Sequence, residues 1–527
     1  MATQDYWAEA PLDRERVPLF ARTLDATIAE DDSVRLFDEV LNSVDWSVWE
    51  AEFGERGRGQ PPIHPRHLAA AILYGLYRGL RSSRKLEEAC CYRMDFIWLL
   101  EGRRPDHSTL AKFRTRFREP LKDLFRQLGR IALTLGLVRL GEVAFDGTRV
   151  KANNSRFKTR TAKTLEAKLQ ALDELFEHLL AESESLDTEQ VGSGSSTRLP
   201  EELAAVEQRR KRLRQALDQV RAADEARRQH GVNPEKNPAQ IPTTDPDSRV
   251  LPNKEGGYAP NYTPVATTDG HRGFIADCDV TADANEGPQA AKSVDRIEET
   301  FGQKPEKFLT DAGNTSGQIQ AAMEEREVEF YAPVESSQPQ PGNPACRDDP
   351  TRAVPSEQWP QLPRNPQGQL DKSCFVYDAE HDLYYCPQGH ALPFEKELPD
   401  KRGGERVTKR TYRCPDCGGC PLAGACISKQ NQRGRTITRD EYEEVRERTA
   451  ARMATESGRQ LYTQRPRIAE TPFGLLKRVM GLRQFLLRGL EKVKTEWRWA
   501  CTAFNLGKLV RELARLRAEL TELAVAG

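Results

Sequence analysis

Two short apolar segments, far apart in the chain, each end in an aspartate that is followed by turn residues. The first, "VAFDGT", reaches Asp146 and Gly147, and the second, "KFLTDAGN", reaches Asp311. In open α/β sheets the groups that contact ligands gather where strands end. If the two strands are neighbours, their ends bring Asp146 and Asp311 within a few ångströms of each other. A single strand-end aspartate is more often the cap of a turn, and that interpretation stays open for each residue taken alone.

The segments between and after these strands predict a mixed α/β domain. "YAPNYTPVATTDGHRGFIADCDVT" predicts two strands joined at Asp269 and Gly270, a residue pair typical of tight turns. A helix is expected over 288–302, and "VEFYAPV" predicts a further strand after a second helix. This order of elements predicts a mixed sheet with insertions, closed by helices at the C-terminal end.

The remaining segments predict insertions and flanking helices. Leucines spaced by three and four residues predict a helical hairpin, and a polar, proline-containing linker over 228–257 follows it. Residues 335–372 are rich in Pro, Gln and Asn and are expected to be a loop. The predicted segments are a helical DNA-binding domain at 1–137, the first part of the α/β core at 138–335 with the hairpin at 158–227 inside it, a Pro-rich and cysteine-rich insertion at 336–436, and C-terminal helices at 437–527.

The N-terminal segment contains a strongly basic stretch. Residues 56–130 hold seventeen Lys and Arg against seven Asp and Glu, although the whole chain has a formal net charge of −1. Asp106 or Ser108 is expected to cap a helix that carries Lys112 and Arg114. Short basic helices joined by turns are compatible with a helix-turn-helix module in which Lys112 and Arg114 contact DNA. They are equally compatible with a plain helical bundle whose charged faces are solvated.

A second basic stretch surrounds one acid, Glu470. Residues 451–500 hold eleven Lys and Arg against four Asp and Glu. We expect Thr471 to cap a helix with Pro472 in its first turn, which would place Glu470 at the positive end of the helix dipole. Lys477 follows two turns later on the same helical face. The residues expected to bind the DNA backbone here are Arg465, Arg467, Lys477, Arg478, Arg483 and Arg488.

Asp146, Asp311 and Glu470 together predict a site for divalent cations. Carboxylates that lie close together repel each other unless a hard cation lies between them. Three such acids are sufficient to hold two Mg²⁺ ions about 3.5–4 Å apart, a pair that stabilises both the attacking and the leaving oxygen of in-line phosphoryl transfer. We therefore expect Mg²⁺, or Mn²⁺ in its place, as the cofactor.

Five of the eleven cysteines crowd into residues 386–426, with His390 nearby. Cys-x2-Cys spacing beside further cysteines is typical of a structural Zn²⁺ site, and an odd number of cysteines argues against a disulfide framework. The expected ligands are Cys386, Cys417, Cys420 and Cys426, and Cys414 is the alternative for one of them. An iron–sulfur cluster and a metal-free knot are the competing interpretations.

The composition is that of a soluble protein. No apolar run approaches the roughly 18–20 residues that a membrane span needs, and the first residues have acids and no apolar core, unlike a secretory signal. We therefore expect a cytoplasmic protein with no membrane partner.

The segments that carry the three acids resemble the catalytic blocks of bacterial insertion-sequence transposases of the DDE type. These segments are "VAFDGTRVKANNS", "FLTDAGNTSG" and "AETPFGLLKRVMGLRQFLLRGLEKVKTEW". "PPIHPRHLAAAILYGLYRGLRSSRKLEEACC" resembles the N-terminal helical domain of the same enzymes. The resemblance implies a ribonuclease-H-like catalytic core, with Asp146, Asp311 and Glu470 as its three catalytic acids.

A signature of related transposases, Tyr-x2-Arg-x3-Glu-x6-Lys, is similar to the pattern of Tyr462, Arg465, Glu470 and Lys477. The spacing from Glu470 to Lys477 is intact, but four residues separate Arg465 from Glu470 instead of three. This departure leaves open whether Arg465 or Arg467 takes the part of the arginine.

The resemblance implies an enzyme that binds the terminal inverted repeats of its own element, cleaves the DNA and joins each 3′-OH to target DNA. Double-stranded DNA at the nucleoid and a second copy of the chain, as a homodimer on DNA, are then the expected partners. One alternative is a domesticated transposase that only binds DNA. Another is a stand-alone ribonuclease-H-like nuclease, which would cut DNA without joining it.

Overall fold

The computed structural model describes residues 23–53, 61–155, 159–189, 198–229, 231–253, 256–334, 336–402, 405–427 and 433–526. The chain divides into two compact units, Met1–Leu124 with Leu506–Gly527, and Phe125–Asn505. Residues 1–22 of the predicted helical domain and the start of its basic stretch lie outside the described residues. Within the described ranges, no helix combines the length and the apolar character that crossing a membrane requires.

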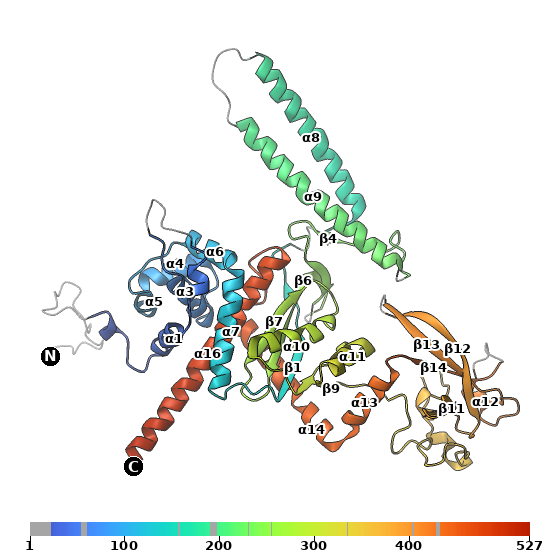
Figure 1. Cartoon of the computed structure of the whole chain (residues 1–527). Helices are drawn as coiled ribbons and strands as arrows, with labels where there is room; N and C mark the ends of the chain where they lie inside the picture. Colours follow the sequence, from blue (N-terminus) through green and yellow to red (C-terminus); the bar gives the residue numbers. More distant parts are fainter. Residues whose placement is uncertain are drawn as a thin grey trace, which may run out of the picture. The chain divides into compact units, whose positions relative to one another are not determined.

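The first unit is helical, as the sequence predicts. Aromatic side chains form much of its core: Trp49 stacks on Phe113 with ring centroids 5.4 Å apart, and Phe117 packs against Phe113 at 4.6 Å. The expected cap is confirmed, because the Asp106 carboxylate accepts hydrogen bonds from the first backbone N–H groups of α6. The helices are α1 (Ser33–Asn42), α2 (Ser47–Glu50), α3 (Pro65–Tyr77), α4 (Ser83–Tyr92), α5 (Met94–Leu99) and α6 (His107–Arg116), while α7 (Arg118–Thr134) and α16 (Leu490–Ala526) continue across the unit boundaries in sequence (Figure 1).

The second unit is built around a mixed sheet. Its main strand order is β7-β6-β1-β8-β9, in which β6 is antiparallel to β1 and β7, while β8 is parallel to both β1 and β9. The strands and the turn at Asp269 that the sequence predicts are confirmed. The strands are β1 (Glu142–Gly147), β6 (Tyr258–Asp269), β7 (Ile275–Thr281), β8 (Lys307–Leu309) and β9 (Glu329–Tyr331), and the short β2 (Val150–Lys151) and β5 (Arg249–Pro252) also pair with β6.

Helices bury the central strands of this sheet. The apolar run Val143–Phe145 of β1 is fully buried, as expected for a strand covered on both faces. Helix α10 (Pro288–Phe301) contacts β7, and α11 (Gly317–Glu325) contacts β9. The start of α16 lies against the antiparallel strands, where the Trp497 Nε1–H donates to the Val265 carbonyl at 3.1 Å. These helices fix the strand ends relative to one another.

The segment 228–257, predicted to be a polar linker, is partly structural. It contains β5, the short β4 (Ile241–Pro242) that pairs with β3 (Thr159–Arg160), and the buried Asp245. The Asp245 carboxylate accepts hydrogen bonds from the Tyr262 hydroxyl at 2.7 Å and the Gly489 N–H at 3.0 Å, and burial raises its pKa. Asp247 accepts from the first N–H of α16. The linker prediction failed because hydrogen bonds to distant residues and a few buried apolar side chains, among them Ile241 and Leu251, hold this segment in place.

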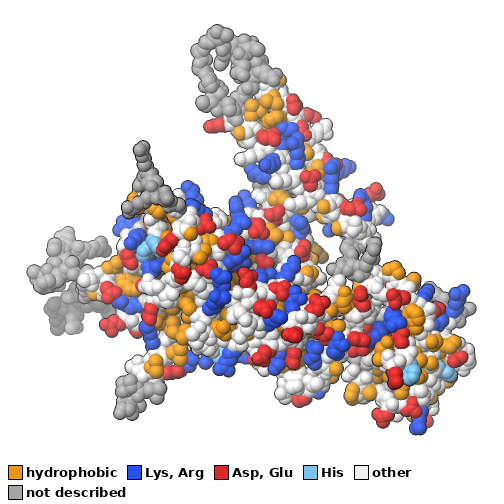
Figure 2. Space-filling model, in the orientation of Figure 1, with side chains coloured by type: hydrophobic (Ala, Val, Ile, Leu, Met, Phe, Trp, Pro, Cys, Tyr) orange, Lys and Arg blue, Asp and Glu red, His pale blue; other side chains and the backbone are white. Residues whose placement is uncertain are grey.

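The predicted helical hairpin is present as α8 (Ala162–Glu189) and α9 (Arg198–Gln229) (Figure 1). The two helices share an apolar core that includes Leu165 and Leu213. An ion pair of 2.6 Å between Arg210 Nε and an Asp173 oxygen crosses between them. Charged side chains of both signs lie along the face of the hairpin that Figure 2 shows, which is typical of a solvated surface.

The cysteine-rich insertion forms a second, antiparallel sheet. Before it, the described residues of the Pro-rich loop hold 3-10 turns at Ser356–Gln361 and Lys372–Cys374 and a single β-bridge between Arg364 and Leu370, in agreement with the loop prediction. The strands, in spatial order, are β10 (Val376–Asp378), β11 (Leu383–Tyr385), β12 (Ala391–Arg402), β13 (Glu405–Arg413) and β14 (Thr436–Asp440), and a short helix, α12 (Ala423–Cys426), lies between the last two in sequence.

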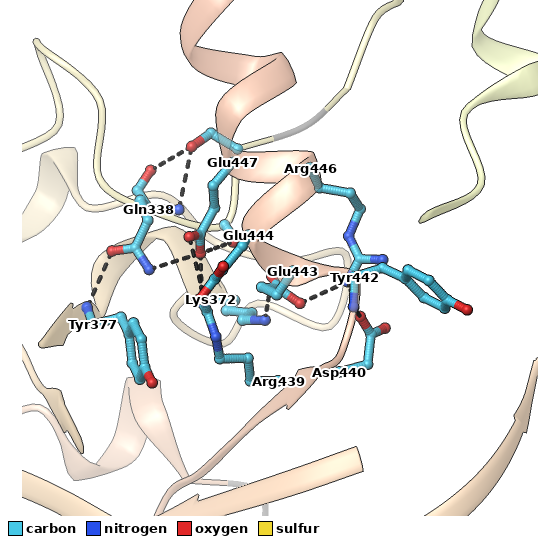
Figure 3. Close-up of polar contacts among 12 residues, drawn as sticks. Gln338, Lys372, Tyr377, Arg439, Asp440, Tyr442, Glu443, Glu444, Arg446 and Glu447 are labelled. Carbon is cyan, nitrogen blue, oxygen red and sulfur yellow. Dashed lines mark hydrogen bonds and ion pairs between the residues drawn. The ribbon is translucent and has the colours of Figure 1, made fainter. Parts of the chain in front are cut away.

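A network of buried charges fastens this insertion to α13 (Glu443–Ala454), the helix that follows β14 (Figure 3). Glu443 is 4% exposed, and its carboxylate lies 2.6 Å from Lys372 Nζ and 2.7 Å from an Arg446 nitrogen. A second pair joins Arg439 of β14 to Glu447 at 2.7 Å. Burial opposes the ionisation of Glu443, but the charge and hydrogen bond of Lys372 outweigh it and lower the pKa of Glu443 to about 2.

The C-terminal helices correct one prediction. After α14 (Glu456–Thr463), helix α15 runs from Arg465 to Arg478, so Glu470 lies in its middle and not at its N-terminus. Pro466 occupies the first turn, a position that suits proline. Thr471 is not a cap: its hydroxyl donates to the carbonyl of Arg467 inside the helix. The prediction was wrong because two prolines fit a first turn, and the chain uses the earlier one.

Replacing Glu443 by Gln should destabilise the second unit. The substitution leaves Lys372 and Arg446 charged and without their shared carboxylate, so we expect the free energy of unfolding in urea to fall by about 3 kcal/mol near neutral pH. Glu443 has a lowered pKa, so the stability that its ionised carboxylate contributes is fully present above pH 4.5, which is the ordinary pKa of a glutamate. This stability is lost as the pH falls through about 2. The difference between wild type and Glu443→Gln should therefore narrow over that range.

The matched control is Glu444→Gln on the same helix, because the Glu444 side chain is 67% exposed and forms only longer ion pairs. Its effect should stay below about 0.5 kcal/mol. Equal effects of the two variants would contradict the role given to Glu443.

Candidate active site

The two strand-end aspartates meet, as the sequence predicts. Strands β1 and β8 are parallel, with Ala144 opposite Leu309, so Asp146 and Asp311 follow at the same edge of the sheet. Asp146 is buried and Asp311 is half-buried. Asp311 also caps a turn, because one of its oxygens accepts hydrogen bonds from the Gly313 N–H at 3.1 Å and the Asn314 side-chain amide at 2.9 Å. The two interpretations of Asp311 are therefore compatible.

A third acid that the sequence analysis missed, Glu286, joins these aspartates. One carboxylate oxygen from each of Asp146, Glu286 and Asp311 lies within 4.8 Å of the others. Glu286 is half-buried in the connection between β7 and α10. The only signal in the sequence is its place between a predicted strand and a predicted helix, which does not distinguish it from other loop acids. Three carboxylates at this spacing can hold a divalent cation.

Arg465, at the start of α15, supplies positive charge to the cluster. Its side chain is 10% exposed, and Nη2 lies 3.3 Å from an Asp146 oxygen and 3.9 Å from an Asp311 oxygen. Neither its Nε nor its Nη2 forms a hydrogen bond. Arg467 is exposed. Of the two arginines that the sequence leaves open, the structure therefore places Arg465 at the acidic cluster.

Two further residues of the signature pattern contact the same strand ends. The Tyr462 hydroxyl donates to the carbonyl of Thr310, next to Asp311, at 3.2 Å, and burial raises the pKa of this tyrosine. Lys477 Nζ donates to the Thr148 hydroxyl at 2.6 Å and to the Arg149 carbonyl at 3.0 Å. Tyr462 and Lys477 thus hold the chain on the C-terminal side of β1 and β8.

Glu470 has an exposed side chain and is not part of the three-carboxylate cluster. Arg467 and Arg478 of the same helix are also exposed. In the first unit, Lys112 is exposed on α6, whereas Arg114 is half-buried and donates to the backbone carbonyl of Arg81. Lys112 is therefore open to a partner, while the guanidinium of Arg114 is engaged within its own unit.

The five clustered cysteines line one cavity of about 20 Å³ together with His390, a volume that suits one small occupant. Around it, the Cys417 sulfur accepts the Arg435 N–H at 3.4 Å. A hydrogen bond from Cys414 lowers the pKa of Cys386, and burial raises that of Cys426 to about 12. Among the described residues, the acidic cluster is the only group of three potential ligands within 4.8 Å of one another, so the choice of four cysteines stays a prediction.

Comparison with protein families gives two matches. Residues 22–116 match the family described as Transposase domain (DUF772), and residues 385–510 match the family described as Transposase DDE domain. The two matches together support an insertion-sequence DDE transposase. No curated protein and no solved structure matches it. The second matched range contains Glu470 and the clustered cysteines, while Asp146, Glu286 and Asp311 lie outside both ranges.

Replacing Arg465 by Gln should destabilise the protein when no divalent cation is present. The variant leaves the buried Asp146 carboxylate facing two other acids without the guanidinium, so we expect the free energy of unfolding to fall by about 2 kcal/mol. The exposed Arg467→Gln should change it by less than about 0.5 kcal/mol. Urea unfolding in the presence of a chelator measures both, and a negligible effect of Arg465→Gln would exclude Arg465 as the counter-charge of the cluster.

Proposed function

We propose that this protein is an active transposase that binds the terminal inverted repeats of its element, cleaves the DNA at the repeat ends and joins the ends to target DNA. The observation that carries the proposal is that two basic residues of the matched DDE domain meet at the end of β1: Arg465 contacts Asp146, and Lys477 contacts the residues that follow it. A carboxylate cluster with basic side chains beside it is suited to phosphoryl transfer, because the acids bind cations and the bases bind phosphate.

We further propose that the central sheet is a ribonuclease-H-like core. Three antiparallel strands in the order β7-β6-β1, followed by two strands parallel to β1, support this assignment. So does the position of the acids, because Asp146 lies at the end of the central strand and Asp311 follows its parallel neighbour. The hairpin α8–α9 and the cysteine-rich insertion are then additions to this core.

Asp146 and Asp311 would hold Mg²⁺ or Mn²⁺, with Glu470 as the third catalytic acid. The donor set fits a hard cation: the three clustered oxygens all belong to carboxylates, and one of the acids is buried. Bound there, the ion supplies charge stabilisation for the attacking and leaving oxygens of phosphoryl transfer. Glu470 lies on α15, the helix that also places Arg465 at the cluster.

The residues around the acids have separate tasks in this proposal. Lys477 fixes the chain just after Asp146, which keeps that carboxylate in place. Arg465 presents buried N–H groups without hydrogen-bond partners, and these can donate to a phosphate oxygen of the DNA. The exposed Arg467 and Arg478 of α15, and Lys112 of the N-terminal unit, can contact the backbone away from the cut. We expect the protein to act as a homodimer on nucleoid DNA in the cytoplasm, because transposition requires two ends held together.

Isosteric replacement of each proposed catalytic acid tests the assignment. Asp146→Asn, Asp311→Asn and Glu470→Gln should each reduce Mg²⁺-dependent cleavage of a repeat-ended DNA by about 10³-fold or more. Binding of the same DNA should stay within a few-fold of wild type. Glu456→Gln, an exposed acid on α14, is the control and should cleave normally. If Glu470→Gln cleaves as well as wild type, Glu470 is not the third acid.

The same assay separates the proposal from its alternatives. Joined products with target DNA exclude a simple nuclease, because hydrolysis alone cannot form them. Repeat binding without any cleavage in Mg²⁺ or Mn²⁺ would instead identify a DNA-binding protein that has lost catalysis.

We also propose a structural Zn²⁺ in the cysteine-lined cavity. The support is the shared cavity, its small volume and the Cys-x2-Cys spacing of Cys417 and Cys420. The ligands would be Cys386, Cys417, Cys420 and Cys426. The site is distant in sequence from the catalytic acids, and its expected role is to hold the insertion together.

Metal analysis of the purified full chain tests this site. Elemental analysis should give about one Zn²⁺ per chain, and Cys417→Ser or Cys420→Ser should remove most of it. Cys346, which is exposed and lies before the second sheet, provides the control, since Cys346→Ser should keep the metal. Iron and sulfide in place of zinc would establish the iron–sulfur alternative.

A further inference from the structure

We propose that Glu286 is a metal ligand of the active site, a further catalytic acid beside Asp146 and Asp311. This inference rests on the proposed metal-dependent function and adds a residue that lies outside both matched family ranges. It assigns to Glu286 direct contact with the divalent cation.

The loop that carries Glu286 is held in place on both sides. Arg149, three residues after Asp146, donates from Nη2 to the Ala284 carbonyl at 2.6 Å. The Thr263 hydroxyl of β6 donates to the Asp283 carbonyl at 2.8 Å. One bond comes from the residues just after β1, the strand that carries Asp146, and the other from the neighbouring strand β6, so the loop keeps a fixed position relative to the cluster.

Two glycines allow Glu286 to approach. A Cβ on Gly147 would lie 3.1–3.2 Å from the side chain of Glu286, so the carboxylate arm packs directly on the backbone that follows Asp146. A Cβ on Gly287 would lie 2.7 Å from Ile319 and 3.1 Å from the Asn314 side chain. Side chains at these two positions would push Glu286 away from the aspartates. Both glycines therefore allow the Glu286 carboxylate to lie close to Asp146 and Asp311.

The charge balance of the cluster points to a cation. Three carboxylates share this space, while Arg465 brings one positive charge, so the cluster keeps an excess of negative charge when the acids are ionised. Arg465 is nine-tenths buried, and its Nη2, which has no hydrogen-bond partner, lies 3.3 Å from an Asp146 oxygen. Such donors are suited to an anionic ligand, and a site that combines them with clustered carboxylates suits a cation together with a phosphate.

Glu286 differs from Glu470 in how it is placed. One carboxylate oxygen of Glu286 lies within 4.8 Å of the aspartate oxygens, whereas Glu470 is exposed on α15. Glu286 therefore has the position of a cation ligand through contacts within this chain alone. This makes cation binding by the free protein the direct test of its role.

Titration of the DNA-free full chain with Mn²⁺, followed by calorimetry and by the electron paramagnetic resonance signal of the free ion, tests the inference. Glu286→Gln should weaken Mn²⁺ binding by about tenfold or more, and Glu286→Asp, which keeps a carboxylate, should weaken it less. Glu299→Gln, an exposed acid on α10, should bind within about twofold of wild type. Circular dichroism of each variant establishes that it is folded.

The outcomes separate this inference from the proposed function. If Asp146→Asn loses Mn²⁺ binding while Glu286→Gln binds like wild type, Glu286 is not a ligand and the metal-dependent function stands. If wild type shows no saturable binding, or binding that Asp146→Asn does not change, the metal site of the proposed function fails and the inference fails with it. Should Glu286→Gln not fold, an unweakened affinity of Glu286→Asp together with cleavage at the wild-type rate would overturn the inference.

Discussion

The parallel pairing of β1 with β8 is the constraint on which the candidate site depends. It sets Ala144 opposite Leu309, so that the chain after each strand emerges at one edge with its aspartate. The neighbouring residues Phe145 and Phe308 stack with ring centroids 5.8 Å apart and are fully buried. Because side chains alternate between faces, a shift of one residue in either strand would break this ring stack and turn the aspartate of that strand to the opposite face. The apolar core therefore enforces the position of the acids.

Helix α15 couples this core to the charge of the site. Its Ile468 packs in one cluster with Ala144 and Leu309, the residues that set the register. One turn earlier, Arg465 reaches the two aspartates. Helix α15 thus buries apolar surface on β1 and β8 and places the Arg465 guanidinium beside the two aspartates at the ends of these strands. Apolar packing holds Arg465 in a position where its charge reduces the repulsion between the acids.

Local sequence patterns were sufficient to predict the strands, the helical hairpin and the proximity of Asp146 to Asp311. Each of these features depends on apolar periodicity or on turn residues within a short window of the sequence. Glu286 could not be found in this way, because its placement depends on Gly147 and on a loop held by distant residues. Asp245 was missed for a related reason: its partners, Tyr262 and Gly489, are identified only by the fold. The start of α15 was misplaced because Pro466 and Pro472 carry the same local signal. Long-range hydrogen bonds and close backbone approaches leave no periodicity to detect.

The structure also explains how a matched DDE domain that contains neither aspartate can belong to their site. None of the strands of the central sheet lies within 385–510, so this range must dock on strands supplied by the rest of the chain. Lys477 makes that connection to the residues after Asp146 across more than 300 positions. Between β9 and α13 the chain passes through the cysteine-rich sheet. The ion pairs of Glu443 with Lys372 and Arg446 fix the position of α13, where the chain leaves that sheet. Because α13 and α14 lead directly into α15, the anchoring of the insertion and the position of Arg465 at the acids are steps along one continuous path.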